Sequence, residues 1–229
     1  DQKTLTTGQL ITFISLFGHL IWPIMGMSMF INMHAQAKAS LQRVNGLLDY
    51  KPDIVDREDV VEVEKLSGEI EVTNLSFKYP GLEENVIENI SFKIKAGESV
   101  GILGKTGSGK TTLIDTLMRI YNVEDGMIKY DGIDINKIPL KVLRDNTAIV
   151  PQDNFLFYDT VYENIAFGTK REVTNHEVME VAKLADLDSN IEEFQQGYET
   201  MIGERGSTIS GGQKQRVSIA RALIKEAPI

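Results

Sequence analysis

The sequence predicts an α/β domain that follows one long apolar helix. Three observations support this prediction. Residues 10–33 contain no Lys, Arg, Asp or Glu, which is typical of a helix that crosses a membrane. Beyond residue 66, short apolar runs are interspersed with segments whose apolar residues recur at helical spacing. A glycine-rich loop at residues 104–111 lies between one such run and one such helix.

The composition excludes several classes of site. The 229 residues include no cysteine, so disulfides, thiolate metal sites and a cysteine nucleophile are excluded. The formal net charge is −9, which argues against a nucleic-acid-binding surface because such a surface must attract phosphates. Nucleic acid is therefore not expected as a partner.

Residues 10–33 predict a membrane-spanning helix. The run is longer than the ~20 residues that cross the hydrocarbon layer, and it lacks the shorter apolar core and the small-residue cleavage site of a secretory signal. A buried helix of a soluble protein is the alternative interpretation. His19 lies within the run, either as part of a polar pathway or bonded to a neighbouring helix. One helix cannot enclose a transport pathway, so we expect the last span of a larger membrane domain.

The charges that flank this helix predict its orientation. Lys38 and Arg43 follow the span, whereas Lys3 before it is offset by Asp1. Because positive residues are enriched on the cytoplasmic side, the part after the helix is expected in the cytosol, within an integral membrane protein. The expected domains are a span with its cytoplasmic extension (residues 1–50), a linker (51–66) and the α/β domain (67–229).

Three short strands are predicted before the glycine-rich loop, at residues 69–77, 86–94 and 99–103, the last of them buried. Tyr79 lies just past the first strand, before a Pro-Gly turn. Its ring is placed to stack on a flat base, although an ordinary strand aromatic is the simpler explanation.

Residues 104–111 match the pattern G-x-x-x-x-G-K-[S/T], which cradles phosphates when it joins a strand to a helix. Its glycines allow a tight bend that turns backbone N–H groups toward one point, and the helix beginning near Lys110 adds a partial positive charge. Lys110 is expected to reach the outer phosphates of a nucleotide, and Thr111 to bind Mg²⁺. A glycine-rich turn before an ordinary helix is the alternative. The expected nucleotide contacts are Tyr79, Gly104, Lys105, Thr106, Gly107, Ser108, Gly109, Lys110, Thr111 and Thr112.

The sequence after the loop predicts further short elements. They are a helix directly after the loop, a hairpin around Asp131-Gly132, a short helix that opens at Pro139, a buried strand at 147–151 followed by Gln152, and a helical stretch from 162 to 194.

A second motif, Ile-Ser-Gly-Gly-Gln-Lys-Gln-Arg, occupies residues 209–216. Ser210 is a good N-cap residue, and the two glycines after it expose backbone N–H groups at the start of a helix. This combination predicts another anion site. A capped helix start with a flexible glycine pair is the alternative explanation.

With these two motifs in this order, the part of the chain from about residue 68 resembles the nucleotide-binding domain of ATP-binding cassette (ABC) transporters, specifically exporters with fused membrane and nucleotide domains. Residues 209–213 resemble the family's Leu-Ser-Gly-Gly-Gln signature, with Ile209 as a mild departure. Tyr79 and Gln152 fall where the family has its adenine-stacking aromatic and the loop glutamine that approaches Mg²⁺. The implied fold is a P-loop NTPase (ABC ATPase) domain with an antiparallel β subdomain and a helical subdomain.

The resemblance implies an ATPase coupled to transport, with ATP held at the interface of a head-to-tail dimer. In this chain it makes Lys110 and Gln152 the catalytic residues, and Thr111 and Gln152 the Mg²⁺ ligands. The partner implied is a second ABC half-transporter, identical or different, and the transported molecule is a small molecule, lipid or peptide. The residues that face the partner's ATP are Ser210, Gly211, Gly212 and Gln213.

Family members place an apolar strand that ends in Asp, then usually Glu, after a segment like residues 225–228, and here Ile229 is the last residue. We therefore expect a fragment that lacks the general base and has negligible ATPase activity by itself. Two alternatives stay open: an ATP-binding, weakly hydrolysing regulatory subunit of a heterodimeric exporter, and a soluble ABC-type ATPase with no role in transport. The predicted span argues against the second.

Overall fold

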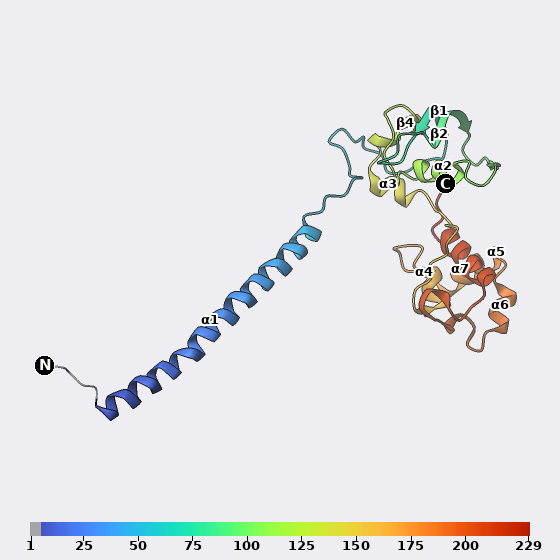
Figure 1. The fold of residues 1–229 in the computed structure, drawn as a ribbon. Coiled ribbons are helices and arrows are strands. Elements are labelled where there is room, and N and C mark those ends of the chain that lie inside the picture. Colours follow the sequence, from blue (N-terminus) through green and yellow to red (C-terminus); the bar gives the residue numbers. More distant parts are fainter. Residues whose placement is uncertain (1–5) are drawn as a thin grey trace. The chain divides into compact units, whose positions relative to one another are not determined.

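A computed structural model describes residues 6–229, which divide into two compact units before and after the junction of Asp53 and Ile54 (Figure 1). The division falls within the segment predicted as a linker, residues 51–66. Asp1 and Lys3, whose charges entered the predicted orientation, lie outside the described residues.

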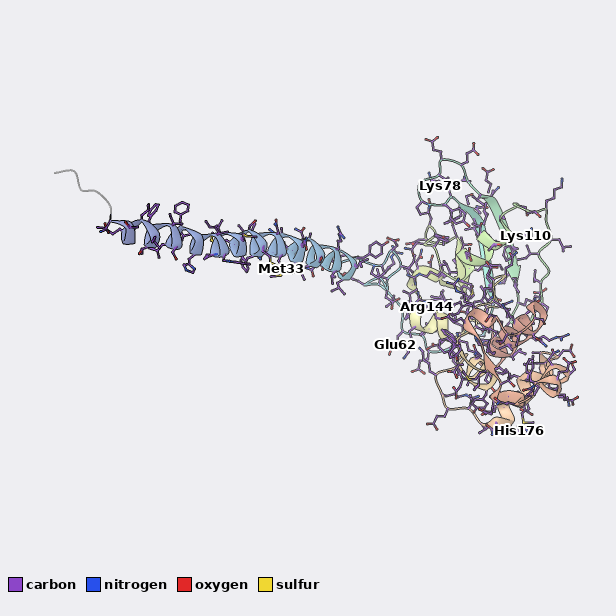
Figure 2. The ribbon with its side chains drawn as sticks, turned by 60° about the horizontal axis from the view of Figure 1, so that its bottom comes forward. Met33, Glu62, Lys78, Lys110, Arg144 and His176 are labelled. Carbon is purple, nitrogen blue, oxygen red and sulfur yellow. The ribbon has the colours of Figure 1, made fainter. Side chains whose placement is uncertain are left out.

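The first unit is one continuous helix, α1 (Thr7–Leu48), of 42 residues. Thr6 caps its start by a reciprocal pair of hydrogen bonds with Gln9, and the helix runs through Pro23 without a break. Its mean hydropathy reaches 1.7, so length and composition are sufficient to cross a membrane. Its side chains project on all sides (Figure 2), and none of them is buried against the described residues. The predicted long apolar helix and its extension are therefore confirmed as one element.

A four-stranded antiparallel sheet opens the second unit. Strand β1 (Ile70–Phe77) pairs with β2 (Ile87–Ile94) and β3 (Ile128–Tyr130), and β3 pairs with β4 (Ile133–Asp134), in the order β2-β1-β3-β4. Asp131 and Gly132 join β3 to β4 with φ of 50° and 80°, as the predicted Asp-Gly hairpin requires. The first two predicted strands and the hairpin are confirmed.

Helix α2 (Lys110–Leu117) shares one hydrophobic core with this sheet. A one-turn 3₁₀ helix (Ile135–Lys137) and helix α3 (Leu140–Asp145), which follows Pro139 as predicted, add Ile135, Ile138 and Leu143 to that core. The fully buried side chains of the core include Leu75, Ile128, Tyr130, Ile135, Ile138 and Leu143. Through Leu113 and Leu117 this core holds α2, and it therefore positions the start of that helix at the glycine-rich loop.

Two of the predicted strands do not form. Residues 99–103 and 147–151 have no strand pairing in the described part of the chain, and Leu103 is 97% exposed. Ala148 N donates to Ile229 O at 2.8 Å, which is an isolated contact and not a ladder. A buried strand needs hydrogen-bonded neighbours, and no segment within residues 6–229 supplies them to these two. Val100, Ile102 and Ile149 line an apolar cleft of about 620 Å³ instead.

The helical part has a second hydrophobic core of its own. The predicted helical stretch from 162 to 194 is three separate helices, α4 (Val161–Ala166), α5 (Asn175–Leu184) and α6 (Asp188–Glu193). Asp186, with φ of 56°, ends the α5 segment because that backbone conformation cannot continue a helix. Helix α7 (Gly211–Leu223) packs against α4 and α5 (Figure 1). The remaining elements are β5 (Asp159–Thr160), its partner β6 (Met201–Ile202) and 3₁₀ turns at Gly197–Glu199 and Glu204–Gly206.

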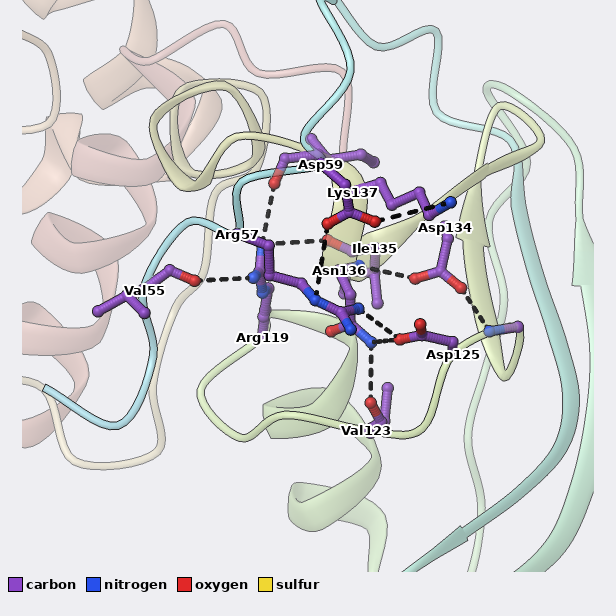
Figure 3. A network of polar contacts seen from close by, with 12 residues as sticks. Val55, Arg57, Asp59, Arg119, Val123, Asp125, Asp134, Ile135, Asn136 and Lys137 are labelled. Carbon is purple, nitrogen blue, oxygen red and sulfur yellow. Dashed lines mark hydrogen bonds and ion pairs between the residues drawn. The ribbon is translucent and has the colours of Figure 1, made fainter.

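A polar network ties residues 54–61 to the domain that follows them (Figure 3). Arg57 Nη1 donates to Asp125 Oδ1 at 2.6 Å, and Arg119 Nη2 donates to the carbonyl of Val55 at 3.2 Å. Hydrogen bonds from Arg57 and Asn136 lower the pKa of the Asp125 carboxyl, whereas burial lowers the pKa of the Arg119 guanidinium. This acidic segment is therefore held against the domain surface, although its charges alone predict a solvated linker.

Candidate functional site

The glycine-rich loop at 104–111 bends where its glycines permit. Gly107 and Gly109 have φ of 81° and 84°, which disfavours any residue with a Cβ atom. A Cβ on Gly104 would lie 2.5 Å from Ser108 Oγ, and one on Gly109 would lie 3.0 Å from the carbonyl oxygen of Val86. Backbone conformation at Gly107 and Gly109, and the close Val86 carbonyl at Gly109, therefore favour glycine in this loop.

The start of helix α2 leaves its N–H groups free of side-chain caps. Gly109 is the N-cap residue, no side chain accepts a hydrogen bond there, and the first turn carries no acidic residue. The first N–H groups of a helix lack intrahelical partners and carry a partial positive charge, so they bind anions. Helices α3 and α6 also start without a side-chain cap, so this feature points to an anion site only together with the glycine-rich loop and Lys110.

The side chain of Lys110 folds back onto the loop that precedes it. Its ammonium donates to the carbonyl oxygens of Gly104 at 3.0 Å and Lys105 at 2.8 Å. An ammonium has three donors, so one remains for a further acceptor. The helix start, the loop and this cation together form a cradle that fits the phosphates of a nucleotide.

Tyr79 lies beside the cradle, two residues after β1. Its hydroxyl is 2.8 Å from Thr112 Oγ1 on α2, and its ring makes edge-to-face contacts with Phe77 and Tyr121, with centroids 5.3 and 5.2 Å away. The structure therefore brings Tyr79 together with the phosphate loop, as an adenine-stacking role requires. The stacking itself stays a prediction.

The two predicted Mg²⁺ ligands, Thr111 and Gln152, are both exposed, and neither makes a side-chain hydrogen bond within residues 6–229. The described residues hold no group of three or more His, Cys, Asp or Glu side chains that would bind a metal ion without a nucleotide. A hydroxyl and an amide oxygen suit Mg²⁺, which takes oxygen ligands and keeps waters and phosphates for its other positions. The donor set present here fits a metal ion that arrives with a nucleotide.

The second motif forms the start of α7. Ser210 Oγ accepts from Gln213 N at 3.3 Å, and Ser210 N donates to Gln213 Oε1 at 2.8 Å, which is a capping box. Gly211 and Gly212 are exposed, and a Cβ on either would meet nothing within 4 Å. Nothing in the described chain requires glycine there, although glycine costs a helix about 0.5–1 kcal/mol relative to alanine.

Gln152 and the start of α7 border one polar cleft of about 610 Å³, which is lined by Val150, Pro151, Gln152, Asp153, Asn154, Gly211, Lys214 and Gln215. No hydrogen bond or ion pair within residues 6–229 links residues 210–213 to residues 104–111. The two motifs therefore act as separate surfaces of this chain, each with backbone N–H groups at a helix start.

Sequence reasoning missed Arg221 and Asn164, which join α7 to the segment after Gln152 through three hydrogen bonds. A signal was available, since Arg221 follows the buried Val217 and Ala220 on the apolar face of α7, where a charged residue needs fixed partners.

Known proteins resemble this chain over its whole length. Residues 87–229 match the family described as "ABC transporter". A probable multidrug resistance ABC transporter ATP-binding/permease protein of Bacillus subtilis (strain 168) is 42% identical over 228 residues, which are 100% of this chain and 39% of that protein. An ATP-dependent lipid A-core flippase of Syntrophus aciditrophicus (strain SB) is 42% identical over 224 residues, 98% of this chain and 37% of the flippase.

A solved structure of a bacterial Atm1-family ABC exporter with ATP bound superposes with a TM-score of 0.81 at 34% identity, covering 98% of this chain and 39% of the exporter chain. The chain thus spans less than two fifths of the length of the proteins that it matches.

Proposed function

Because this chain belongs to the ABC transporter family, we propose that it is part of a subunit of an ATP-driven exporter, which binds ATP with Mg²⁺ and couples hydrolysis to transport across a membrane. The observation that carries this proposal is the phosphate cradle. The uncapped start of α2, the positive-φ glycines before it and the ammonium of Lys110 converge on one anion site.

Each part of the cradle has a proposed role in the reaction, which transfers the terminal phosphoryl group of ATP to water. Lys110 and the loop N–H groups hold the phosphates and stabilise the charge that develops on them, and Tyr79 holds the base. Thr111 and Gln152 would hold Mg²⁺, which neutralises phosphate charge when bound. Gln152 also fixes the position of the attacking water.

A second copy of the domain, in a head-to-tail dimer, is the proposed source of the other half of the site. Within residues 6–229 no hydrogen bond or ion pair joins residues 210–213 to the phosphate loop, and a Cβ on Gly211 or Gly212 would meet nothing within 4 Å. A nucleotide held by the partner would use that space and the N–H groups at the start of α7. Closure of the dimer around ATP would then move the attached membrane helices.

Helix α1 is proposed as one span of the membrane domain, with the nucleotide-binding part in the cytosol. Its side chains are exposed along its whole length, which an aqueous environment would penalise by about 25 cal/mol for each Å² of apolar surface. The names of the relatives favour a drug-like small molecule or a lipid over a peptide as the transported molecule. The second half-transporter would be identical to this subunit or related to it.

The test uses the intact transporter in proteoliposomes. We expect detergent to be necessary for extraction, and ATP-dependent accumulation of a drug or lipid probe to disappear with Lys110→Ala. Extraction by salt alone would overturn the membrane assignment and favour a soluble ATPase. A complex whose turnover survives Lys110→Ala here but not the equivalent change in its partner would make this chain the regulatory, weakly hydrolysing subunit.

A further inference from the structure

Arg221 is a half-buried cation without an acidic partner. Its guanidinium donates from Nε to the carbonyl of Asn164 at 2.8 Å, from Nη2 to Asn164 Oδ1 at 2.7 Å, and from Nη1 to the carbonyl of Phe155 at 2.7 Å. Its Cζ atom lies 5.6 Å from the ring centroid of Phe157 and 5.8 Å from that of Phe167. No carboxylate within residues 6–229 forms an ion pair with it, and burial lowers the pKa of the guanidinium. All of its polar partners therefore lie on the segment from 155 to 164.

The side chain of Asn164 holds the same segment through hydrogen bonds within it. It is 1% exposed, accepts from Phe157 N at 2.9 Å, and donates to the carbonyls of Phe157 at 3.1 Å and Thr160 at 2.9 Å. Arg221 holds both the backbone and the side chain of Asn164, so the two residues act as one clamp. The clamp ends at Phe155, three residues after Gln152.

A close backbone contact sets the distance between the same two parts. A Cβ on Gly168, just past α4, would lie 2.0 Å from the carbonyl oxygen of Arg221 and 2.6 Å from Ile224 Cγ2. The end of α7 therefore lies against the α4 segment with no room for any other residue type. This contact sets the distance between α7 and the α4 segment. The forked guanidinium of Arg221 sets their relative orientation, and a lysine cannot reproduce that fork.

We propose that Arg221 is a positioning residue that fixes residues 210–213 relative to Gln152. Helix α7 begins at the glycine pair and carries Arg221 near its other end, so a rotation of α7 moves both together. The segment clamped by Arg221 leads directly to Gln152, and Gln152 faces the start of α7 across their shared cleft. This inference rests on the proposed function, in which Gln152 and residues 210–213 both take part in hydrolysis. Arg221 keeps these two parts at the distance and orientation that hydrolysis requires.

The test compares Arg221→Lys with Arg216→Lys in the intact transporter. Arg216 lies on the same helix, but its bonds go to Asn190 at 2.7 Å and Asp186 at 3.0 Å, away from the Gln152 segment. We expect Arg221→Lys to lower kcat for ATP about 10-fold or more, because a displacement of about 1 Å is enough for that, while KM for ATP and the nucleotide affinity stay within about twofold. Arg216→Lys should leave kcat within about twofold of the wild type.

A second variant, Gly168→Ala, should reproduce the split between kcat and KM, because it displaces α7 from the same segment without removing a charge. Wild-type kcat retained by a folded Arg221→Lys protein would overturn the inference. So would an equal loss in nucleotide affinity and kcat accompanied by a large fall in Tm, which would mark Arg221 as only structural. Failure of the wild type to hydrolyse ATP would instead overturn the proposed function.

Discussion

The hydroxyl of Tyr79, two residues past strand β1, lies 2.8 Å from the hydroxyl of Thr112 in the first turn of α2, the helix that follows the phosphate loop. Residues 33 positions apart in the chain thus meet at one site. The contact holds the Tyr79 ring next to the helix that follows the phosphate loop, as the proposed base-stacking role of Tyr79 needs. The aromatic residue Tyr79 and the glycine-rich loop, which are separate in the sequence, therefore belong to one candidate site.

Two variants of Tyr79 distinguish the contribution of its ring from that of its hydroxyl. Tyr79→Phe removes only the bond to Thr112, so we expect unfolding to become about 1 kcal/mol easier and ATP affinity to stay within about twofold. Tyr79→Ala removes the ring and the base-stacking contribution of ~1–3 kcal/mol, which corresponds to roughly 5- to 150-fold weaker ATP binding. Titration with a fluorescent ATP analogue measures both.

Tyr121→Ala is the matched control, because Tyr121 belongs to the same aromatic cluster, with its ring 5.2 Å from that of Tyr79. It should lower stability without a comparable loss of ATP affinity. Unchanged ATP binding by Tyr79→Ala would show that Tyr79 is an ordinary strand aromatic with no role in binding.

Substitutions of Lys110 and Ser210 are predicted to impair different steps, nucleotide binding and hydrolysis respectively. Lys110→Ala removes a cation from the cradle, so nucleotide binding by the chain that carries it should weaken about 10-fold or more. Ser210→Ala should leave that binding unchanged and impair hydrolysis by the dimer, because in the proposed dimer Ser210 faces the partner's nucleotide. Binding by the separated subunit and turnover by the assembled transporter distinguish the two effects.

Loss of the Ser210 cap also costs α7 about 1 kcal/mol, which needs its own control. Thr174 caps α5 by the same kind of capping box, so Thr174→Ala imposes a similar loss on a helix that carries neither motif. Hydrolysis should survive Thr174→Ala. Equal loss of subunit ATP affinity in the Lys110 and Ser210 variants would contradict a site shared between two chains.

Local signals account for most of what the sequence predicts correctly. The Asp131-Gly132 turn, the cap at Ser210 and the glycines at 107 and 109 depend on the φ angles and hydrogen bonds of neighbouring residues, which residue type largely determines. The strand prediction at 99–103 is wrong for the opposite reason. Apolar residues there satisfy the pattern of a strand, but pairing depends on segments distant in sequence.

The clamp at Arg221 illustrates the same limit within the site. Its partners, Phe155 and Asn164, are 66 and 57 residues away, and a lone arginine on a helix carries no pattern that names them. The docked segment at 54–61 is similar, since its acidic composition predicts solvation whereas Arg57 and Arg119 hold it through distant partners. Long-range polar contacts with specific geometry are what the sequence alone does not predict here.

The glycines of the two motifs are predicted to respond differently to alanine. Gly109 has φ of 84° and lies close to the Val86 carbonyl, so Gly109→Ala should destabilise the fold by about 1–2 kcal/mol. Gly212 has open space around it, so Gly212→Ala should leave Tm unchanged or slightly higher. Its added methyl group would nevertheless obstruct the partner's nucleotide, and turnover should fall about tenfold or more. Full turnover by Gly212→Ala would argue against a nucleotide above α7.

The helical part is predicted to lose stability in acid through Glu177. Hydrogen bonds from the backbone and hydroxyl of Thr174, and then from Arg171, lower the pKa of this carboxyl from 4.5 to about 2. Because the folded pKa lies below the unfolded one, the stabilisation is fully present above about pH 5 and is lost as the pH falls toward 2. Glu177→Gln keeps a side chain that can complete the capping box and removes only the charge.

We therefore expect Glu177→Gln to lower Tm at pH 7 and the difference from the wild type to close between about pH 5 and pH 2. Glu172→Gln is the matched control, since it removes the same charge next to Arg171 from a side chain that does not cap α5. Its effect on Tm should be small across the whole range. A Glu177→Gln effect that is constant from pH 7 to pH 2 would show that the lost interaction is not the ionised carboxylate, and would leave the amide's poorer fit at the cap as the cause.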